Sequence, residues 1–226
     1  MIERVVSMDE MEAAGVVLAG GQSSRMGRDK ALVPFAGRPL IEHALEALEE
    51  AGLSVSIAGA SPAAESTLAA YAPIIRDSQR GLGPLAGICA ALEAASTRYA
   101  VFIPVDLPLL PTSLITYLLY RARITECAVT VPTVNGFAQT FPVVLDRCVL
   151  PALLAALVSE KRGCFAAFES AAEGLGQRIA GIPVELPVQS GQVAHPCGLP
   201  PFRWFLNVNT PWDLQRAEQL AAHSIA

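Results

Sequence analysis

Residues 15–30 read GVVLAGGQSSRMGRDK, a short apolar run that leads directly into a glycine-rich loop. The apolar residues 15–19 predict a buried strand, and Gly20 and Gly21 would let backbone N–H groups approach a polyphosphate without interference from a Cβ atom. Arg25 and Lys30 add positive charge to the same loop. The loop lacks the lysine–hydroxyl pair of a Walker A motif and the spacing of a dinucleotide-binding GxGxxG motif. Two interpretations remain, a phosphate-binding loop and a plain strand-to-helix turn with a solvated polar tail.

Downstream of this loop, apolar runs alternate with amphipathic segments. We expect strands at residues 53–58, 73–77, 99–104 and 204–208, and helices between Pro39 and Gly52, at 62–71, 84–95, 112–123, 149–160 and 163–172, and onward from Thr210. Strands that alternate with helices imply crossover connections and a mostly parallel sheet. Residues 128–132 and 137–145 instead predict two strands joined through the hairpin signal Asn135-Gly136. The pattern therefore predicts an α/β fold with a mostly parallel sheet and a short antiparallel excursion.

The length of the chain, 226 residues, suits one domain. We expect a single domain over residues 15–226, preceded by a polar, flexible leader of residues 1–14. Residues 174–201 are rich in Gly, Pro and Gln and show no clear periodicity, so their structure and their relation to any ligand stay open.

The composition excludes several classes of protein. Hydrophobic residues make up 52% of the chain and charged residues 16%, yet the most apolar stretches, residues 107–120 and 148–159, are too short to span a bilayer. The acidic residues near the N-terminus do not suit an export signal, and five cysteines without a CxxC pair favour reduced thiols, so we expect a cytoplasmic protein. A net charge of -5 argues against a nucleic-acid partner or an anionic membrane surface.

Asp106 follows an apolar run, in the sequence VFIPVDLP of residues 101–108. An ionised carboxylate at the end of a buried strand needs a partner, because its desolvation is costly. Mg²⁺ is a natural partner, since it binds through one or two carboxylates together with phosphate oxygens of a substrate. The alternative is a carboxylate that caps the helix expected from Thr112.

A second acidic residue, Asp77, ends another expected strand and precedes the sequence GLGPLAG of residues 81–87. A glycine-rich approach to a helix N-terminus suits a phosphate or a ring that packs against the backbone. A plain connecting loop accounts for the same residues almost as well.

Taken together, these motifs resemble the molybdenum cofactor guanylyltransferases, which are MobA-like nucleotidyltransferases. The resemblance rests on LAGGQSSRMGRDK at residues 18–30, on RDS and GLGPLAG at 76–87, on PVDLPLLP at 104–111 and on NVNTPWDL at 207–214, and it extends from about Gly15 to Leu220. It implies a Rossmann-like three-layer α/β sandwich. It also implies transfer of GMP from GTP to molybdopterin, with Mg²⁺ as cofactor and pyrophosphate as the second product.

The resemblance also implies roles for individual residues. Residues of the loop, namely Leu18, Ala19, Gly20 and Gly21, would hold the nucleotide, together with Lys30 on the phosphates, Asp77 in the GTP site and Asp106 as the Mg²⁺ ligand. Asn207 and Asn209 are candidates for a place near the acceptor or the metal, although a strand end and a helix cap explain them equally well. One departure concerns residues 57–60, IAGA, where members of the family often have an asparagine that contacts the nucleotide.

The expected chemistry requires no nucleophilic side chain, because the acceptor is a phosphate monoester that is already anionic at neutral pH. The enzyme must hold two polyanions in line and neutralise the leaving pyrophosphate, for which Arg25, Lys30 and Asp106 with Mg²⁺ are the expected catalytic groups. Alternatives are a cytidylyltransferase that uses CTP, another small-molecule nucleotidyltransferase and a non-catalytic nucleotide-binding module. Contact with other proteins of cofactor assembly is a further expectation that rests on the resemblance alone.

Overall fold

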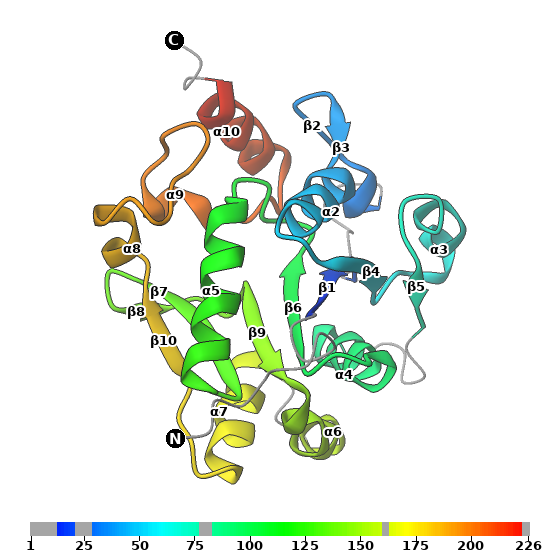
Figure 1. Ribbon diagram of the computed structural model, residues 1–226. Helices are drawn as coiled ribbons and strands as arrows, with labels where there is room; N and C mark the ends of the chain where they lie inside the picture. The colour runs from blue at the N-terminus through cyan, green and yellow to red at the C-terminus, as the bar shows by residue number, and fades with distance from the viewer. Residues whose placement is uncertain (1–12, 21–28, 77–82, 160–162, 223–226) are drawn as a thin grey trace.

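The computed structural model describes residues 13–20, 29–76, 83–159 and 163–222 (Figure 1). Its strands are β1 (Ala13–Leu18), β2 (Pro34–Phe35), β3 (Arg38–Pro39), β4 (Ser54–Ala58), β5 (Ile74–Ile75), β6 (Tyr99–Pro104), β7 (Val129–Val134), β8 (Phe137–Ala138), β9 (Val143–Asp146) and β10 (Ala180–Pro183). Its helices are η1 (Lys30–Leu32), α2 (Leu40–Glu50), α3 (Pro62–Leu68), α4 (Pro84–Ala94), α5 (Thr112–Thr125), η2 (Arg147–Val149), α6 (Leu150–Val158), α7 (Cys164–Gly174), α8 (Glu185–Gln189), α9 (Pro201–Trp204) and α10 (Pro211–Ala222).

The main sheet has the strand order β10-β7-β9-β6-β1-β4-β5, with β8 paired to β7. β1 lies between β6 and β4 and is parallel to both. β9 is antiparallel to β6 and to β7, whereas β10 is parallel to β7. The predicted α/β fold, with a mostly parallel sheet and an antiparallel excursion, is therefore confirmed.

Helices cover both faces of this sheet, which gives three layers (Figure 1). One core lies between the sheet and helices α2, α3, α5 and α10. The other core lies between the sheet and helices α4, α6 and α7. β1 contributes to both cores, because successive side chains of a strand point to opposite faces: Val17 packs in the first core and Val16 and Leu18 in the second. The nearly continuous apolar sequence of β1 follows from this burial on two sides.

The turn at Asn135-Gly136 joins β7 to β8, as its sequence predicts. Both residues have positive φ, 50° and 80°, which is the backbone that an Asn-Gly hairpin favours. The strand expected over residues 137–145 is interrupted, however, and only β8 and β9 are strands within it. β9 leaves β8 and inserts between β6 and β7, so the excursion places an antiparallel strand inside the sheet.

The strand expected at residues 204–208 is wrong. Both neighbours of β6 are already in place, since β1 pairs with one edge and β9 with the other, so this segment has no free edge of β6 to join. Residues 201–204 form the short helix α9 instead, and the buried Trp204 donates its indole N–H to Leu199 O at 2.7 Å. After α9 the chain crosses the end of β6, where Val208 N donates to Asp106 O at 2.9 Å.

Residues 174–201, which showed no sequence periodicity, contain β10 and α8 and then pack beside the loop that follows Asp106. His195 connects this segment to the loop after Asp106. Its Nε2 lies 3.1 Å from Leu109 O, and its Nδ1 accepts a hydrogen bond from Cys197 N. This pairing places the single proton of the neutral ring on Nε2. Burial lowers the pKa of His195, and the hydrogen bond to Leu109 opposes that shift.

The lowered pKa of His195 predicts a loss of stability in mild acid. The unfolded chain takes up a proton on this histidine at a higher pH than the folded chain does, so the free energy of unfolding falls as the pH drops through the ordinary histidine range. Urea denaturation of the wild type and of His195→Gln at pH 7.5 and at pH 5.5, with about pH 6.5 as the ordinary midpoint, should show a smaller acid-induced loss in the variant. Equal losses would show that other groups carry the pH dependence.

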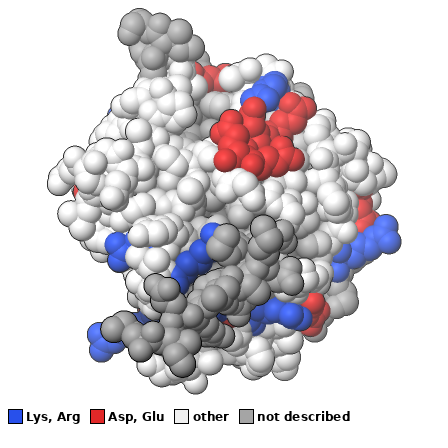
Figure 2. Space-filling view, in the orientation of Figure 1, with Lys and Arg blue, Asp and Glu red and all other residues white. Residues whose placement is uncertain are grey.

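Acidic side chains gather over α2, which carries Glu42, Glu46, Glu49 and Glu50, and basic side chains are scattered over the same face of the molecule (Figure 2). Over the described ranges, the helices are all too short or too polar to cross a membrane.

Candidate active site

The candidate site lies where β1, β4 and β6 end side by side. Ala19 N donates to Ala58 O at 2.9 Å, and Val105 N donates to Leu18 O at 3.1 Å, so the pairing of the strands continues into the loops that follow them. In open parallel sheets, ligands bind beyond the carboxyl ends of the strands, because the connecting loops converge there. The loop after β1 and the loop after β6 therefore reach the same edge.

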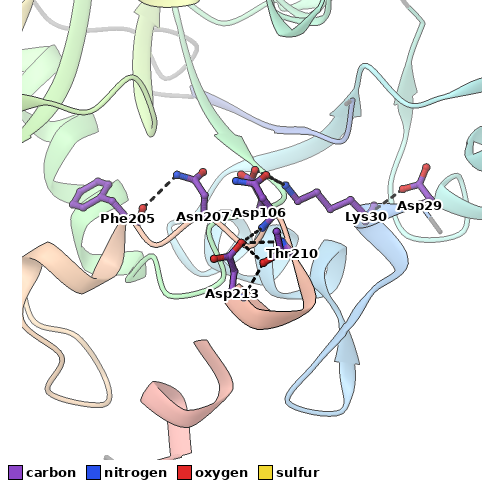
Figure 3. Close-up of polar contacts among 9 residues, drawn as sticks. Asp29, Lys30, Asp106, Phe205, Asn207, Thr210 and Asp213 are labelled. Carbon is purple, nitrogen blue, oxygen red and sulfur yellow. Dashed lines mark hydrogen bonds and ion pairs between the residues drawn. The ribbon is translucent and has the colours of Figure 1, made fainter. Parts of the chain in front are cut away.

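At this edge, Lys30 contacts both Asp106 and Asn209, and Figure 3 shows the side chain of Lys30 reaching Asp106. Lys30 Nζ lies 2.7 Å from Asp106 Oδ2 and 2.6 Å from Asn209 Oδ1. The side chains of Lys30 and Asp106 are only 17% and 19% exposed. Because the two contacts join positions 76 and 179 residues apart in the sequence, they depend entirely on the fold.

The backbone around Lys30 is held by its neighbour Asp29. One carboxylate oxygen of Asp29 accepts from Ala31 N at 3.0 Å and caps the short helix η1, and the other accepts from Ser61 Oγ at 3.3 Å. Ser61 is itself the N-cap of α3. Asp29 thus connects the start of η1, and with it Lys30, to the loop that follows β4.

The backbone around Asn209 is held by Asp213 in the first turn of α10. Asp213 Oδ2 accepts from Asn209 N at 3.1 Å, from Thr210 N at 2.8 Å and from Thr210 Oγ1 at 2.8 Å, while Asp213 N donates to Thr210 Oγ1 at 3.2 Å. The hydrogen bond from the Thr210 hydroxyl is the main reason why the pKa of Asp213 is lowered. This reciprocal capping confirms the helix start that the sequence predicts at Thr210.

Three glycines meet beside this site, after β1, after β4 and within α4. A Cβ atom on Gly20 would lie 2.6 Å from Gly59 O, and one on Gly87 would lie 3.3 Å from Gly59 N. Gly59 has a φ of +73°, which residues with a side chain rarely adopt. The close approach therefore requires glycine at position 20, the positive φ favours glycine at position 59, and a Cβ atom at position 87 would be tight against the backbone of Gly59.

The contact between Gly20 and Gly59 predicts that Gly20→Ala is damaging. The added methyl group meets a backbone carbonyl rather than a flexible side chain, so the loops must separate at a cost of about 1–3 kcal/mol. We expect a lower midpoint in urea denaturation and weaker binding of nucleoside triphosphate in a thermal-shift titration. Gly174→Ala is the matched control, because an added Cβ atom there would meet nothing within 4 Å and its φ is ordinary. An unchanged midpoint for Gly20→Ala would contradict the prediction.

The structure places the other sequence-predicted residues as follows. Leu18 and Ala19 are buried at the end of β1, so they can present only backbone groups to a ligand. Asn207 is exposed, and its side-chain amide donates to Phe205 O at 3.5 Å. Gly21, Arg25 and Asp77 lie outside the described residues.

Some residues at the site carry no assigned role in the sequence-based prediction. Gly59 stands out in the sequence only as part of a departure from the family pattern, and its contact with Gly20 emerges from the pairing of β1 with β4. Asp213 is recognisable as a helix-capping acid, but its hydrogen bond to Asn209 N, and hence its link to Lys30, is not.

The residues at this edge fit a divalent cation that also binds a phosphate ligand. Among the described residues, Asp106 Oδ1 is buried and has no hydrogen-bond partner, so it remains available as a ligand oxygen. The described part of the chain contains no group of three or more His, Cys, Asp or Glu residues that could hold a metal ion by itself. Mg²⁺ often binds through few carboxylates and completes its coordination with water and substrate phosphates.

Comparison with known proteins agrees with this geometry. Residues 15–174 match the family model of the MobA-like NTP transferase domain. A probable molybdenum cofactor guanylyltransferase of Bacillus mycoides is 31% identical over 211 residues, which cover 92% of this chain and 96% of that protein. The chain belongs to the MobA-like NTP transferase family. As a nucleotidyltransferase of this family, it also shares 46% identity over 107 residues with the molybdenum cofactor guanylyltransferase of Xanthomonas euvesicatoria, a match that covers 46% of this chain and 52% of that protein.

Solved structures support the same fold for this nucleotidyltransferase. Molybdopterin-guanine dinucleotide biosynthesis protein A of Archaeoglobus fulgidus superposes with a TM-score of 0.75 and 23% identity, over 93% of this chain and 99% of that one. Rv0371c of Mycobacterium tuberculosis, in a complex with manganese, superposes with a TM-score of 0.63 and 17% identity, over 92% and 98% of the two chains. The expected Rossmann-like architecture is thereby confirmed.

Proposed function

We propose that this nucleotidyltransferase transfers GMP from GTP to molybdopterin and releases pyrophosphate, forming the guanine dinucleotide form of the cofactor. The observation that carries the proposal is the contact of Lys30 with Asp106 and Asn209 at the strand edge of a chain that aligns with a guanylyltransferase over 92% of its length. A non-catalytic nucleotide-binding module would not need to keep both a lysine and a carboxylate at this edge.

The chain's own residues are suited to bind and orient a triphosphate. Backbone N–H groups of the loop after Ala19 are proposed to face the phosphates, since Gly20 carries no Cβ atom. Lys30 supplies a positive charge close to the same edge and is proposed to contact the phosphate oxygens. Arg25 and Asp77, from the same set of sequence-predicted residues, complete the proposed nucleotide site.

Asp106 is proposed to hold Mg²⁺, with Asn209 close by. Bound there, Mg²⁺ would supply charge neutralisation for the triphosphate and for the leaving pyrophosphate. The buried Oδ1 of Asp106 is the group that best suits this role. Asn207, exposed on the same segment as Asn209, is proposed to lie on the acceptor side.

The attacking group is a phosphate monoester, which is anionic at neutral pH, so the protein need not remove a proton from it. What remains for the protein is alignment of two polyanions and stabilisation of the charge that develops on the leaving group. Lys30 and the backbone amides of the glycine loop meet both needs. We further propose that the reaction takes place in the cytoplasm and that the acceptor is received from other proteins of cofactor assembly.

The direct test is pyrophosphate release with molybdopterin as the acceptor, measured separately with GTP, CTP, ATP and UTP. The proposal expects GTP to be the preferred substrate. A preference for CTP would identify a cytidylyltransferase, a result worth testing because residues 57–60 contain no asparagine. Equal rates with all four nucleotides, or no release with any of them, would overturn the guanylyl assignment.

A further inference from the structure

Lys30 holds two oxygen atoms that would each suit a divalent cation. Its ammonium group lies 2.7 Å from the carboxylate oxygen Oδ2 of Asp106 and 2.6 Å from the amide oxygen Oδ1 of Asn209 (Figure 3). Oxygen donors of these kinds are the ligands that Mg²⁺ and Mn²⁺ prefer. The lysine therefore engages the same side chains that the proposed metal site would use.

A divalent cation on Oδ1 of Asp106 and the ammonium group in its present position on Oδ2 would repel one another. A metal ion bound by a carboxylate lies about 2.0–2.1 Å from the ligand oxygen. At that distance it would stand close to Lys30 Nζ, which contacts the other oxygen of the same carboxylate. Two cations at such separation repel strongly at a site that is less than one-fifth exposed.

Of the three side chains in this contact, that of Lys30 is the longest and the most flexible. The backbone beside Asp106 is bonded to Val208 N, and the backbone of Asn209 is bonded to the Asp213 carboxylate. The start of η1 is capped by Asp29. Lysine, by contrast, carries its charge on four rotatable carbons and readily exchanges one oxygen partner for another.

We propose that Lys30 is a built-in counter-ion of Asp106, and that a divalent cation gains this carboxylate efficiently only together with a polyphosphate that takes the ammonium group away. The two side chains then exchange partners. The Lys30 ammonium group moves from the carboxylate to the phosphate, and the Asp106 carboxylate binds the metal in place of the ammonium group. This inference rests on the proposed site for nucleotide and metal, and it makes Lys30 a positioning residue that couples the two binding events.

The first experiment measures binding of Mn²⁺ alone, without nucleotide or acceptor, by electron paramagnetic resonance of the free ion. Lys30→Met is expected to bind Mn²⁺ at least about tenfold more tightly than the wild type, a difference of about 1.4 kcal/mol. Lys30→Arg, which keeps the charge, and Arg38→Met, which removes an exposed cation paired with Glu46, should stay close to the wild type. The double variant Asp106→Asn/Lys30→Met should lose the gain.

Several outcomes would overturn the proposal. Mn²⁺ binding that is unchanged or weaker in Lys30→Met would do so, as would equal tightening in Lys30→Arg or in Arg38→Met. Tight binding that survives in the double variant would place the metal elsewhere. Because neither GTP nor molybdopterin is present, these results are separate from the outcome of the pyrophosphate-release test. Melting curves by circular dichroism establish that each variant is folded, and Lys30→Gln replaces Lys30→Met if that variant is not.

A second experiment follows Lys30 in the unmodified protein, which has only two lysines, Lys30 and Lys161. With lysine labelled by ¹³C at Cε, nuclear magnetic resonance should show two signals, assigned with Lys161→Arg. Mg²⁺ with inorganic tripolyphosphate is expected to shift the Lys30 signal, whereas Mg²⁺ alone at the same concentration leaves it in place. An equal shift with Mg²⁺ alone would show that the ion displaces the ammonium group without a phosphate partner and would overturn the proposal.

Discussion

Asp106→Ala is expected to lower kcat for metal-dependent nucleotidyl transfer by about 10²–10³-fold or more, the range found when a preorganised electrostatic group is removed from an active site. The variant loses the buried oxygen Oδ1 and with it the proposed metal ligand. It also takes one oxygen partner from Lys30 and leaves the contact with Asn209 in place. The measurement is steady-state pyrophosphate release over a range of Mg²⁺ concentrations.

The fold should tolerate this change, because Lys30 keeps its contact with Asn209 Oδ1 and carries its charge at the end of a flexible stem. Asp146→Ala provides the contrast. Asp146 is 6% exposed, pairs with Arg98 at 2.7 Å and caps η2 at the opposite end of β6. It should melt at a lower temperature yet turn over normally while folded. An active, metal-dependent Asp106→Ala enzyme would remove Asp106 as the metal ligand.

Lys30→Ala is expected to weaken binding of the nucleoside triphosphate by about 10–10²-fold, because charged hydrogen bonds contribute about 1.5–3 kcal/mol each. The loss should be larger in kcat/KM than in binding affinity. Negative charge builds up on the leaving pyrophosphate in the transition state, so Lys30 stabilises the transition state more than the bound triphosphate. Thermal-shift titration with GTP measures the affinity, and pyrophosphate release measures the rate.

Arg38→Ala is the control for the loss of one positive charge, because Arg38 pairs with Glu46 on the exposed side of α2. It should bind GTP as the wild type does. If Lys30→Ala binds GTP normally, or if its melting temperature without ligand falls as far as that of a core variant, the assignment of Lys30 to the phosphates is wrong.

Much of the fold could be predicted because each of its signals is local. The apolar run of β1, the alternation of strands and helices through α5, the Asn135-Gly136 turn and the cap at Thr210 all appear in the structure where the sequence places them. These features depend on residues a few positions apart, whose preferences for helix, strand or turn act before the chain is folded.

The errors fall where sequence neighbours do not decide the outcome. Residues 204–208 have the composition of a strand, but β1 and β9 occupy both edges of β6. Trp204 instead ends α9, and residues 205–208 form a crossing loop. β10 has a weak strand sequence, yet it forms because the edge of β7 is available to it. Pairing partners, which are distant in sequence, override local propensity in both cases.

By itself, the sequence determined the class of fold, the strand edge at which the site lies and the residue types that a polyphosphate and a metal require. Only the tertiary structure decided that Lys30, Asp106 and Asn209 touch, that Gly20 lies against Gly59 and that Asp213 holds the backbone of Asn209. The physical reason is the range of the interactions. Helix, turn and strand preferences act within a few residues, whereas a contact between charges 76 residues apart exists only after parallel strands have aligned their carboxyl ends.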